Sequence, residues 1–228
     1  MSSGEAGAAP DPAEVTLIVI AKEPVPGRAK TRLAPALGDD GAAGLAEAAL
    51  ADTLDAVAEA ARAGGNRVLL ALDGEPGPWL PEPPPEIRIT AQRGNGLGER
   101  LAAAFADAGG PALLVGMDTP QLRPEALTAG CALLCAPGCD AVIGLAEDGG
   151  YWALGLRRAG PSLFEGVPMS EDETGARQLE ALHAAGLETL HLPVLADVDE
   201  IGDAERVAAQ APDTRFAATL ARLKAERG

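Results

Sequence analysis

Short apolar runs alternate with longer amphipathic segments along this chain, and the alternation limits the folds open to it. The first run, residues 15–21, is continuous and rich in β-branched residues, which is typical of a strand buried on both faces of a parallel sheet. Further strands are predicted at 67–72, 87–91, 112–116, 141–145, 151–156 and 189–192. Helices are predicted at 39–63, 99–108, 124–135 and 173–185, with more helix beyond residue 202.

This order of elements favours an α/β fold with a doubly wound sheet. Strands that alternate with helices of this length indicate a mostly parallel central sheet flanked by helices. The runs on either side of residues 147–150 have no helix between them, so they predict an antiparallel hairpin added to that sheet. We expect one domain over residues 15–228, preceded by a disordered tail over residues 1–14.

The net charge excludes some classes of partner. The 228 residues include 18 basic and 34 acidic side chains, which give a formal charge of -16. A chain this acidic repels polyphosphate backbones and anionic lipid, so nucleic acid and membrane are not expected partners. No run is long enough to span a bilayer, and the first residues lack a signal-peptide pattern. The cytoplasm is the expected location.

The scarce basic residues gather just after the first predicted strand. Residues 22–32, here called the basic loop, carry four cations and one acid, a net +3 that leaves -19 for the rest of the chain. The cations are Lys22, Arg28, Lys30 and Arg32. With Gly27, which lets the backbone approach a ligand, they form a candidate phosphate cradle. The alternative is a basic loop that pairs with an acidic surface.

Carboxylates follow two other predicted strands. Asp118 comes directly after the buried run 112–116, while Asp197 and Asp199 follow residues 189–192. Ligands in open α/β sheets bind beyond the carboxyl ends of strands, and Mg²⁺ takes one or two carboxylates together with phosphate oxygens. The alternatives are a helix cap at Asp118 and a solvated acidic turn at the later pair. Alternation predicts that Asp197 and Asp199 point to the same side.

Two glycine-containing segments give weaker signals. Residues 94–98 could lie against a planar base, but a plain turn between strand and helix is favoured. Residues 147–150 have the composition of a hairpin turn. The acids Glu147 and Asp148 beside Gly149 and Gly150 could also hold sugar hydroxyls or deprotonate one.

Five motifs together resemble a known bacterial family. Their order matches that of nucleotide-diphospho-sugar transferases, some of which are labelled arsenosugar-biosynthesis glycosyltransferases. The motifs are K-x-P-x-P-G-x-x-K-T-R-L at 22–33, G-L-G-E-R at 96–100, G-M-D-T-P-Q-L at 116–122, A-E-D-G-G-Y at 146–151 and D-V-D at 197–199. The resemblance covers about residues 15–210. It implies the Rossmann-like GT-A fold and a more distant similarity to phospholactate guanylyltransferase and molybdenum-cofactor nucleotidyltransferases.

The resemblance also implies roles for individual residues. Asp118 and Asp199 would hold Mg²⁺ or Mn²⁺, with Asp197 as the other candidate for the second ligand. The residues themselves, two acids beside two glycines, make Asp148, with Glu147 second, the candidate base for an acceptor bound near Gly149, Gly150 and Ser170. The nucleotide and its phosphates would be bound by the following residues, of which Lys30 is also expected to be catalytic: Lys22, Gly27, Arg28, Lys30, Arg32, Gly96, Leu97, Gly98 and Arg100.

The expected activity is transfer of a sugar from a nucleotide diphospho-sugar to a small-molecule acceptor. The alternative is nucleotidyl transfer from a nucleoside triphosphate to a phosphorylated small molecule, with release of pyrophosphate. Both reactions need the same cations and metal, so the motifs separate them poorly. A nucleotide-binding protein without catalysis is the third possibility. Family members often carry an aromatic residue where this chain has Met169, so the acceptor side is expected to differ.

Overall fold

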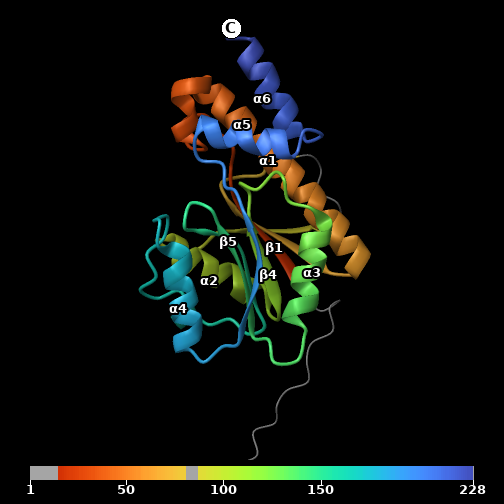
Figure 1. Ribbon diagram of the computed structural model, residues 1–228, viewed down its shortest axis with the longest axis vertical. Helices are drawn as coiled ribbons and strands as arrows, with labels where there is room; N and C mark the ends of the chain where they lie inside the picture. The colour runs from red at the N-terminus through yellow and green to blue at the C-terminus, as the bar shows by residue number, and fades with distance from the viewer. Residues whose placement is uncertain (1–14, 81–86, 228) are drawn as a thin grey trace, which may run out of the picture.

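A seven-stranded sheet forms the centre of the protein, described here from a computed structural model that covers residues 15–80 and 87–227 (Figure 1). The strand order is β3-β2-β1-β4-β6-β5-β7, and only β6 runs antiparallel to its neighbours. The strands are β1 (Thr16–Lys22), β2 (Arg67–Asp73), β3 (Ile87–Ala91), β4 (Ala112–Gly116), β5 (Ala141–Ala146), β6 (Tyr151–Leu156) and β7 (Thr189–Leu195). The predicted mostly parallel α/β sheet is confirmed. The predicted tail, residues 1–14, lies outside the described residues.

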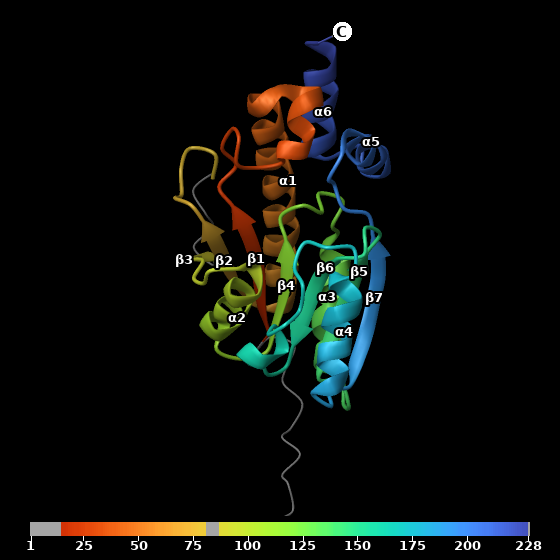
Figure 2. The same ribbon diagram turned by 90° about the vertical axis from the view of Figure 1, so that its left-hand side faces the viewer.

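Helices cover both faces of the sheet (Figure 2). α1 (Ala34–Gly64) and α3 (Pro124–Leu134) lie on one face, and α2 (Leu97–Ala108) and α4 (Thr174–Ala184) on the other. Alternate residues of β1 face opposite ways, so Leu17 and Val19 pack toward the first pair while Ile18 packs toward the second. A 3-10 turn, η3 (Pro161–Leu163), precedes α4.

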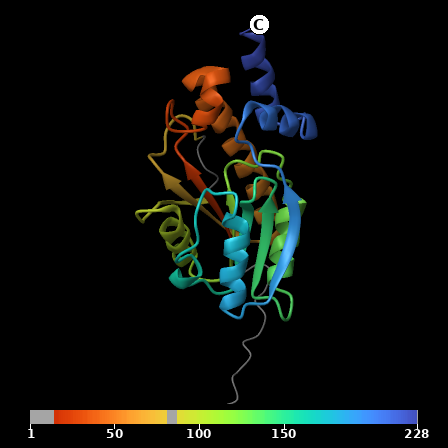
Figure 3. The same cartoon turned by 60° about the vertical axis from the view of Figure 1, so that its left-hand side comes forward.

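A third apolar cluster lies beyond the carboxyl ends of the parallel strands (Figure 3). We call it the cap. It comprises η2 (Thr31–Leu33), the first part of α1, α5 (Ile201–Gln210) and α6 (Arg215–Ala225). Its buried side chains include Leu33, Leu37, Val198, Phe216 and Leu220. The cap therefore joins the start of the chain to its last helices.

Two elements extend beyond their predicted bounds, each for a physical reason. α1 begins at Ala34, but Gly38, at φ 72°, is not helical and separates a short first piece from the longer helix that starts at the predicted residue 39. β7 continues through Pro193 to Leu195; it is an edge strand, where the missing proline N–H is tolerated. The antiparallel strand β6 lies inside the sheet, between β4 and β5.

Within residues 15–80 and 87–227, none of the helices is both long and apolar enough to cross a bilayer.

Candidate functional site

Four segments meet at the carboxyl edge of the sheet. They are the basic loop after β1, residues 117–120 after β4, the turn 147–150 between β5 and β6, and residues 196–200 after β7. β1, β4, β5 and β7 all end at this edge because they run in the same direction. Ion pairs between these segments, described below, show that residues far apart in the chain come together here.

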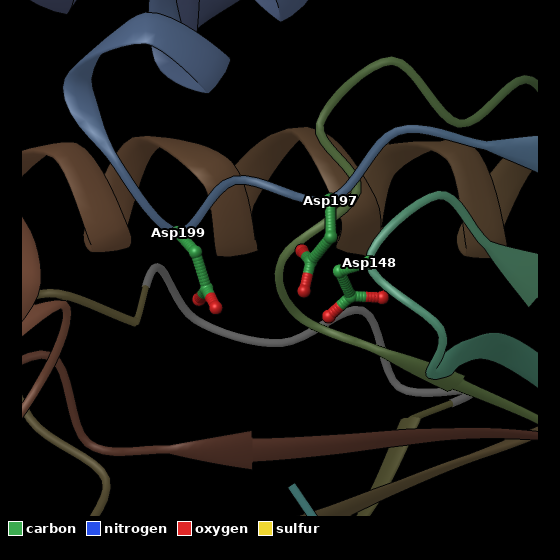
Figure 4. Close-up of side chains that lie close together, drawn as sticks. All are labelled: Asp148, Asp197 and Asp199. Carbon is green, nitrogen blue, oxygen red and sulfur yellow. The ribbon is translucent and has the colours of Figure 1, made fainter. Parts of the chain in front are cut away.

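Three carboxylates point toward one another at this edge (Figure 4). One oxygen each from Asp148, Asp197 and Asp199 lies within 4.8 Å of the other two. We call these residues the acidic group. Asp148 Oδ1 accepts a hydrogen bond from Gly150 N at 2.9 Å, which orients the carboxylate within the hairpin turn. Asp197 and Asp199 point to the same side, as predicted, because Val198 between them is buried in the cap.

Lys30 ties the basic loop to two of the other segments. Its Nζ lies 3.0 Å from Asp118 Oδ1 and donates a hydrogen bond to Val198 O. The Lys30 side chain is only 8% exposed, and its backbone adopts the left-handed region at φ 49°. Burial alone would lower the pKa of the ammonium, but Asp118, Asp197 and Asp199 outweigh it and raise the pKa. Lys30 is therefore a charged, fixed counter-ion among the acids.

Asp197 occupies the least favourable position for a carboxylate. Burial raises its pKa to about 6; Lys30 opposes the shift, and nearby Asp118 adds to it. Its Oδ1 accepts a hydrogen bond from Val198 N at 2.7 Å, which also favours the ionised form. An acid held at this pKa ionises fully only above neutral pH or when another cation approaches.

The exposed arginines of the basic loop pair with different acids. Arg32 Nη1 lies 2.5 Å from Asp199 Oδ2, so it reaches the acidic group. Arg28 lies 3.8 Å from Asp73, at the end of β2, and Arg100 lies 2.6 Å from the same carboxylate. Asp73 is not among the residues predicted from the sequence to belong to the site. Its position as the last residue of a strand ending at this edge was the available signal.

The segment 94–98 connects β3 to α2, in agreement with the favoured prediction of a turn between strand and helix; Leu97 and Gly98 are the first two residues of α2. Asn95 N donates to the Glu99 carboxylate at 2.8 Å, and Arg100 Nε donates to Gly94 O. Gly96 is the residue before the helix, and Leu97 remains 39% exposed. The turn thus leaves small residues and one apolar side chain open beside Arg100.

The loop that carries Ser170 packs against the hairpin turn. Gly175 N donates to Gly149 O at 2.8 Å, and a side chain at Gly149 would overlap the carbonyl of Asp172. Ser170 adopts the left-handed region at φ 64°. The predicted acceptor residues Gly149, Gly150 and Ser170 therefore belong to two adjoining loops, next to Asp148.

The predicted metal ligands divide between two arrangements. Asp197 and Asp199 lie in the acidic group. Asp118 pairs with Lys30 instead, while Asp148, predicted as an acceptor base, completes the group. Glu147 points to another partner, because its carboxylate lies 3.4 Å from Arg206 of α5.

The chain is similar to one bacterial protein family and to several solved structures. Residues 53–171 match the family of uncharacterized proteins conserved in bacteria, DUF2064. The structure is similar to that of a candidate nucleotide-diphospho-sugar transferase from Desulfovibrio desulfuricans G20, with a TM-score of 0.81 and 28% identity over 93% of this chain and 96% of the other. A search of curated proteins gives no match.

More distant structures share the fold. CMP:2-keto-3-deoxy-manno-octonic acid synthetase, solved with CTP, superposes with a TM-score of 0.52 at 16% identity, over 86% of this chain and 97% of the other. Rv0371c from Mycobacterium tuberculosis H37Rv gives 0.51 at 19% identity, over 86% and 97%. The sheet and its flanking helices thus form the nucleotide-sugar transferase fold, and the chain belongs to the DUF2064 family of bacterial proteins.

Proposed function

We propose that this protein is a metal-dependent glycosyltransferase that takes a sugar from a nucleotide diphospho-sugar and passes it to a small acceptor. One observation carries the proposal: the basic loop and the acidic group meet at the carboxyl edge of the sheet, joined by the pair Arg32–Asp199 at 2.5 Å. A diphosphate needs cations on both sides, and this edge supplies arginines together with carboxylates for a metal.

The acidic group fits a hard divalent cation. Asp148, Asp197 and Asp199 offer three carboxylate oxygens within 4.8 Å, and oxygen donors of this kind suit Mg²⁺ or Mn²⁺. Such a cation would stabilise the charge that develops on the departing nucleoside diphosphate. Asp118, which Lys30 holds beside Asp197, is the fourth candidate ligand.

The exposed cations are the groups available to phosphate. We assign the phosphates to Lys22, Arg28 and Arg32, together with the backbone at Gly27, which has φ 76°. Lys30 has a different task, because its ammonium is buried against Asp118 and Val198 O. We assign it the positioning of the two acidic segments.

The remaining predicted residues are assigned to the nucleoside of the donor and to the acceptor. We assign the base and ribose to Gly96, the residue before α2, and to Leu97, Gly98 and Arg100 in its first turn. We assign the acceptor to Gly149, Gly150 and Ser170. Because Asp148 lies in the acidic group, we assign it to the metal and give the acceptor's proton to Glu147, whose side chain is 54% exposed.

The chemistry at the acceptor follows from these assignments. The bond between the anomeric carbon and the diphosphate oxygen breaks, and a bond to the acceptor oxygen forms. The acceptor hydroxyl gives its proton to Glu147. The basic loop holds the diphosphate oxygens as they gain charge, which favours the transition state over the bound donor.

The similarity to the Desulfovibrio protein supports sugar transfer, since it spans nearly the whole of both chains at 28% identity. Nucleotidyl transfer is the second candidate. The fold shared with a synthetase that binds CTP favours it, although the likeness concerns the fold alone.

The test measures binding and then products. A thermal-shift panel of nucleoside triphosphates and nucleotide sugars, with and without Mn²⁺, identifies the donor, because ligands that bind the folded state raise the melting temperature. The D199N variant should lose the Mn²⁺-dependent part of the shift, whereas R177Q on the outer face of α4 should keep it. During turnover we expect release of nucleoside diphosphate. Release of pyrophosphate would establish nucleotidyl transfer, and no shift with any compound would refute the nucleotide-binding proposal.

A further inference from the structure

Two cations of the basic loop contact the acids in different ways. Lys30 is 8% exposed and has two oxygen partners, Asp118 Oδ1 and Val198 O. The Arg32 side chain is 68% exposed and pairs with Asp199, whose side chain is 39% exposed. Lys30 is thus fixed by its surroundings, whereas the Arg32–Asp199 pair can open without exposing buried charge.

We infer that Arg32 is a releasable counter-ion that competes with the divalent cation for Asp199 until a phosphate takes the guanidinium away. The inference rests on the proposed function, because it assumes that the cation binds the acidic group and that phosphate binds the basic loop. Phosphate and metal would then strengthen each other's binding through one arginine.

The energies of the contacts allow this exchange. Exposed ion pairs are weak and open easily, so a ligand can replace the Arg32–Asp199 contact at small cost. A guanidinium binds a phosphate through two parallel hydrogen bonds, which offers Arg32 a partner at least as good as the carboxylate. While Arg32 remains on Asp199, it occupies one of the two carboxylate oxygens and places a positive charge next to the acidic group.

Arg28 provides the matched comparison within the same loop. Its side chain is 57% exposed, similar to that of Arg32, but it lies 3.8 Å from Asp73, which is not in the acidic group. Both arginines are assigned to phosphate, and only Arg32 contacts a proposed metal ligand. Substitution of either residue removes one positive charge from the loop.

The experiment measures Mn²⁺ binding with and without inorganic pyrophosphate, which stands for the diphosphate shared by all candidate donors. Wild type, R32Q and R28Q are titrated with Mn²⁺ while the electron paramagnetic resonance signal of the free ion is followed. Free concentrations are corrected for the Mn²⁺–pyrophosphate complex. Melting curves confirm that each variant is folded.

Without pyrophosphate, we expect R32Q to bind Mn²⁺ about three- to fivefold more tightly than wild type, and R28Q to stay within about twofold. Pyrophosphate should tighten Mn²⁺ binding by a larger factor in wild type and R28Q than in R32Q, and the coupling must be reciprocal. Equal or weaker Mn²⁺ binding by R32Q would overturn the inference while leaving the proposed function standing. Failure of wild type to bind Mn²⁺ and pyrophosphate together would overturn both.

Discussion

The core of the sheet and the core of the cap are built from equally buried side chains but lie at different distances along the chain from the charged residues of the site. Phe105 of α2 belongs to the sheet core and Phe216 of α6 to the cap, and they are 2% and 1% exposed. The cap core also contains Leu33 and Val198, which are direct neighbours of Arg32 and of the two late aspartates. Apolar packing in the cap therefore positions the charges, whereas packing around the sheet supports the fold as a whole.

The largest expected effects come from truncating these two phenylalanines. F105A and F216A should each lower the free energy of unfolding by about 3–5 kcal/mol, the usual cost of a phenylalanine-sized cavity. F216A should in addition weaken Mn²⁺ binding, since it loosens the segment that carries Asp197 and Asp199. Denaturant unfolding and Mn²⁺ titration below the melting range check the two effects separately.

The milder pair F105L and F216L serves if either alanine variant does not fold. The cap should still differ from the sheet: metal affinity falls only in F216L. Equal losses of Mn²⁺ affinity in both variants would mean that cap and sheet contribute equally to the position of the metal ligands.

An intermediate effect is expected from Lys30, where the charged network replaces apolar packing. K30M should lower the free energy of unfolding by about 2 kcal/mol, because Asp118 and Asp197 lose their counter-ion. The cost is smaller than for a fully buried pair, since the Asp118 side chain is 41% exposed. The double variant K30M/D118N should recover part of the loss in a double-mutant cycle. If the effects of K30M and D118N on the free energy of unfolding are strictly additive, Lys30 and Asp118 do not interact.

The smallest expected stability effect depends on pH and concerns Asp197. Its pKa of about 6 in the folded protein lies above the ordinary value of 3.8, so the native state binds the proton more tightly than the unfolded chain. The stability from this group is fully present below about pH 4 and is lost as pH rises through about 6.

D197N should therefore raise the free energy of unfolding by about 1–2 kcal/mol at pH 8 and change it little near pH 4. The same substitution should weaken Mn²⁺ binding at every pH, because it removes a carboxylate of the acidic group. Unfolding curves at the two pH values check the sign. A destabilised D197N at pH 8 would show that the ionised carboxylate is satisfied by Lys30 after all.

Local sequence patterns predicted most elements of the fold. The run 112–116 is apolar throughout because β4 is covered on both faces, and its predicted bounds match the structure. Prediction failed where a residue's behaviour depends on its place in the sheet. A proline would end a central strand, but β7 continues through Pro193 because it lies at the edge of the sheet. Only the strand order shows that β7 has this position.

For the candidate site, the sequence indicated which charged residues lie at the carboxyl edge of the sheet but not which of them contact one another. Asp118 and Lys30 were both expected to contact ligand or metal, yet the structure pairs them with each other at 3.0 Å. Asp148 was expected to act on the acceptor, and it lies with Asp197 and Asp199. Asp73 is not predicted from the sequence as a site residue, although it pairs with both Arg28 and Arg100.

Local features of the sequence were enough to predict the alternation of strands and helices, the cations concentrated after the first strand and the acids that follow later strands. Hydrophobic periodicity is a local property, and it reports which way a side chain faces within its own element. Tertiary structure decided which charges meet. The Arg32–Asp199 pair joins residues 167 positions apart, and it exists because the cap packs the basic loop against the segment after β7. No local pattern encodes that distance, since it follows from the packing of elements from both ends of the chain.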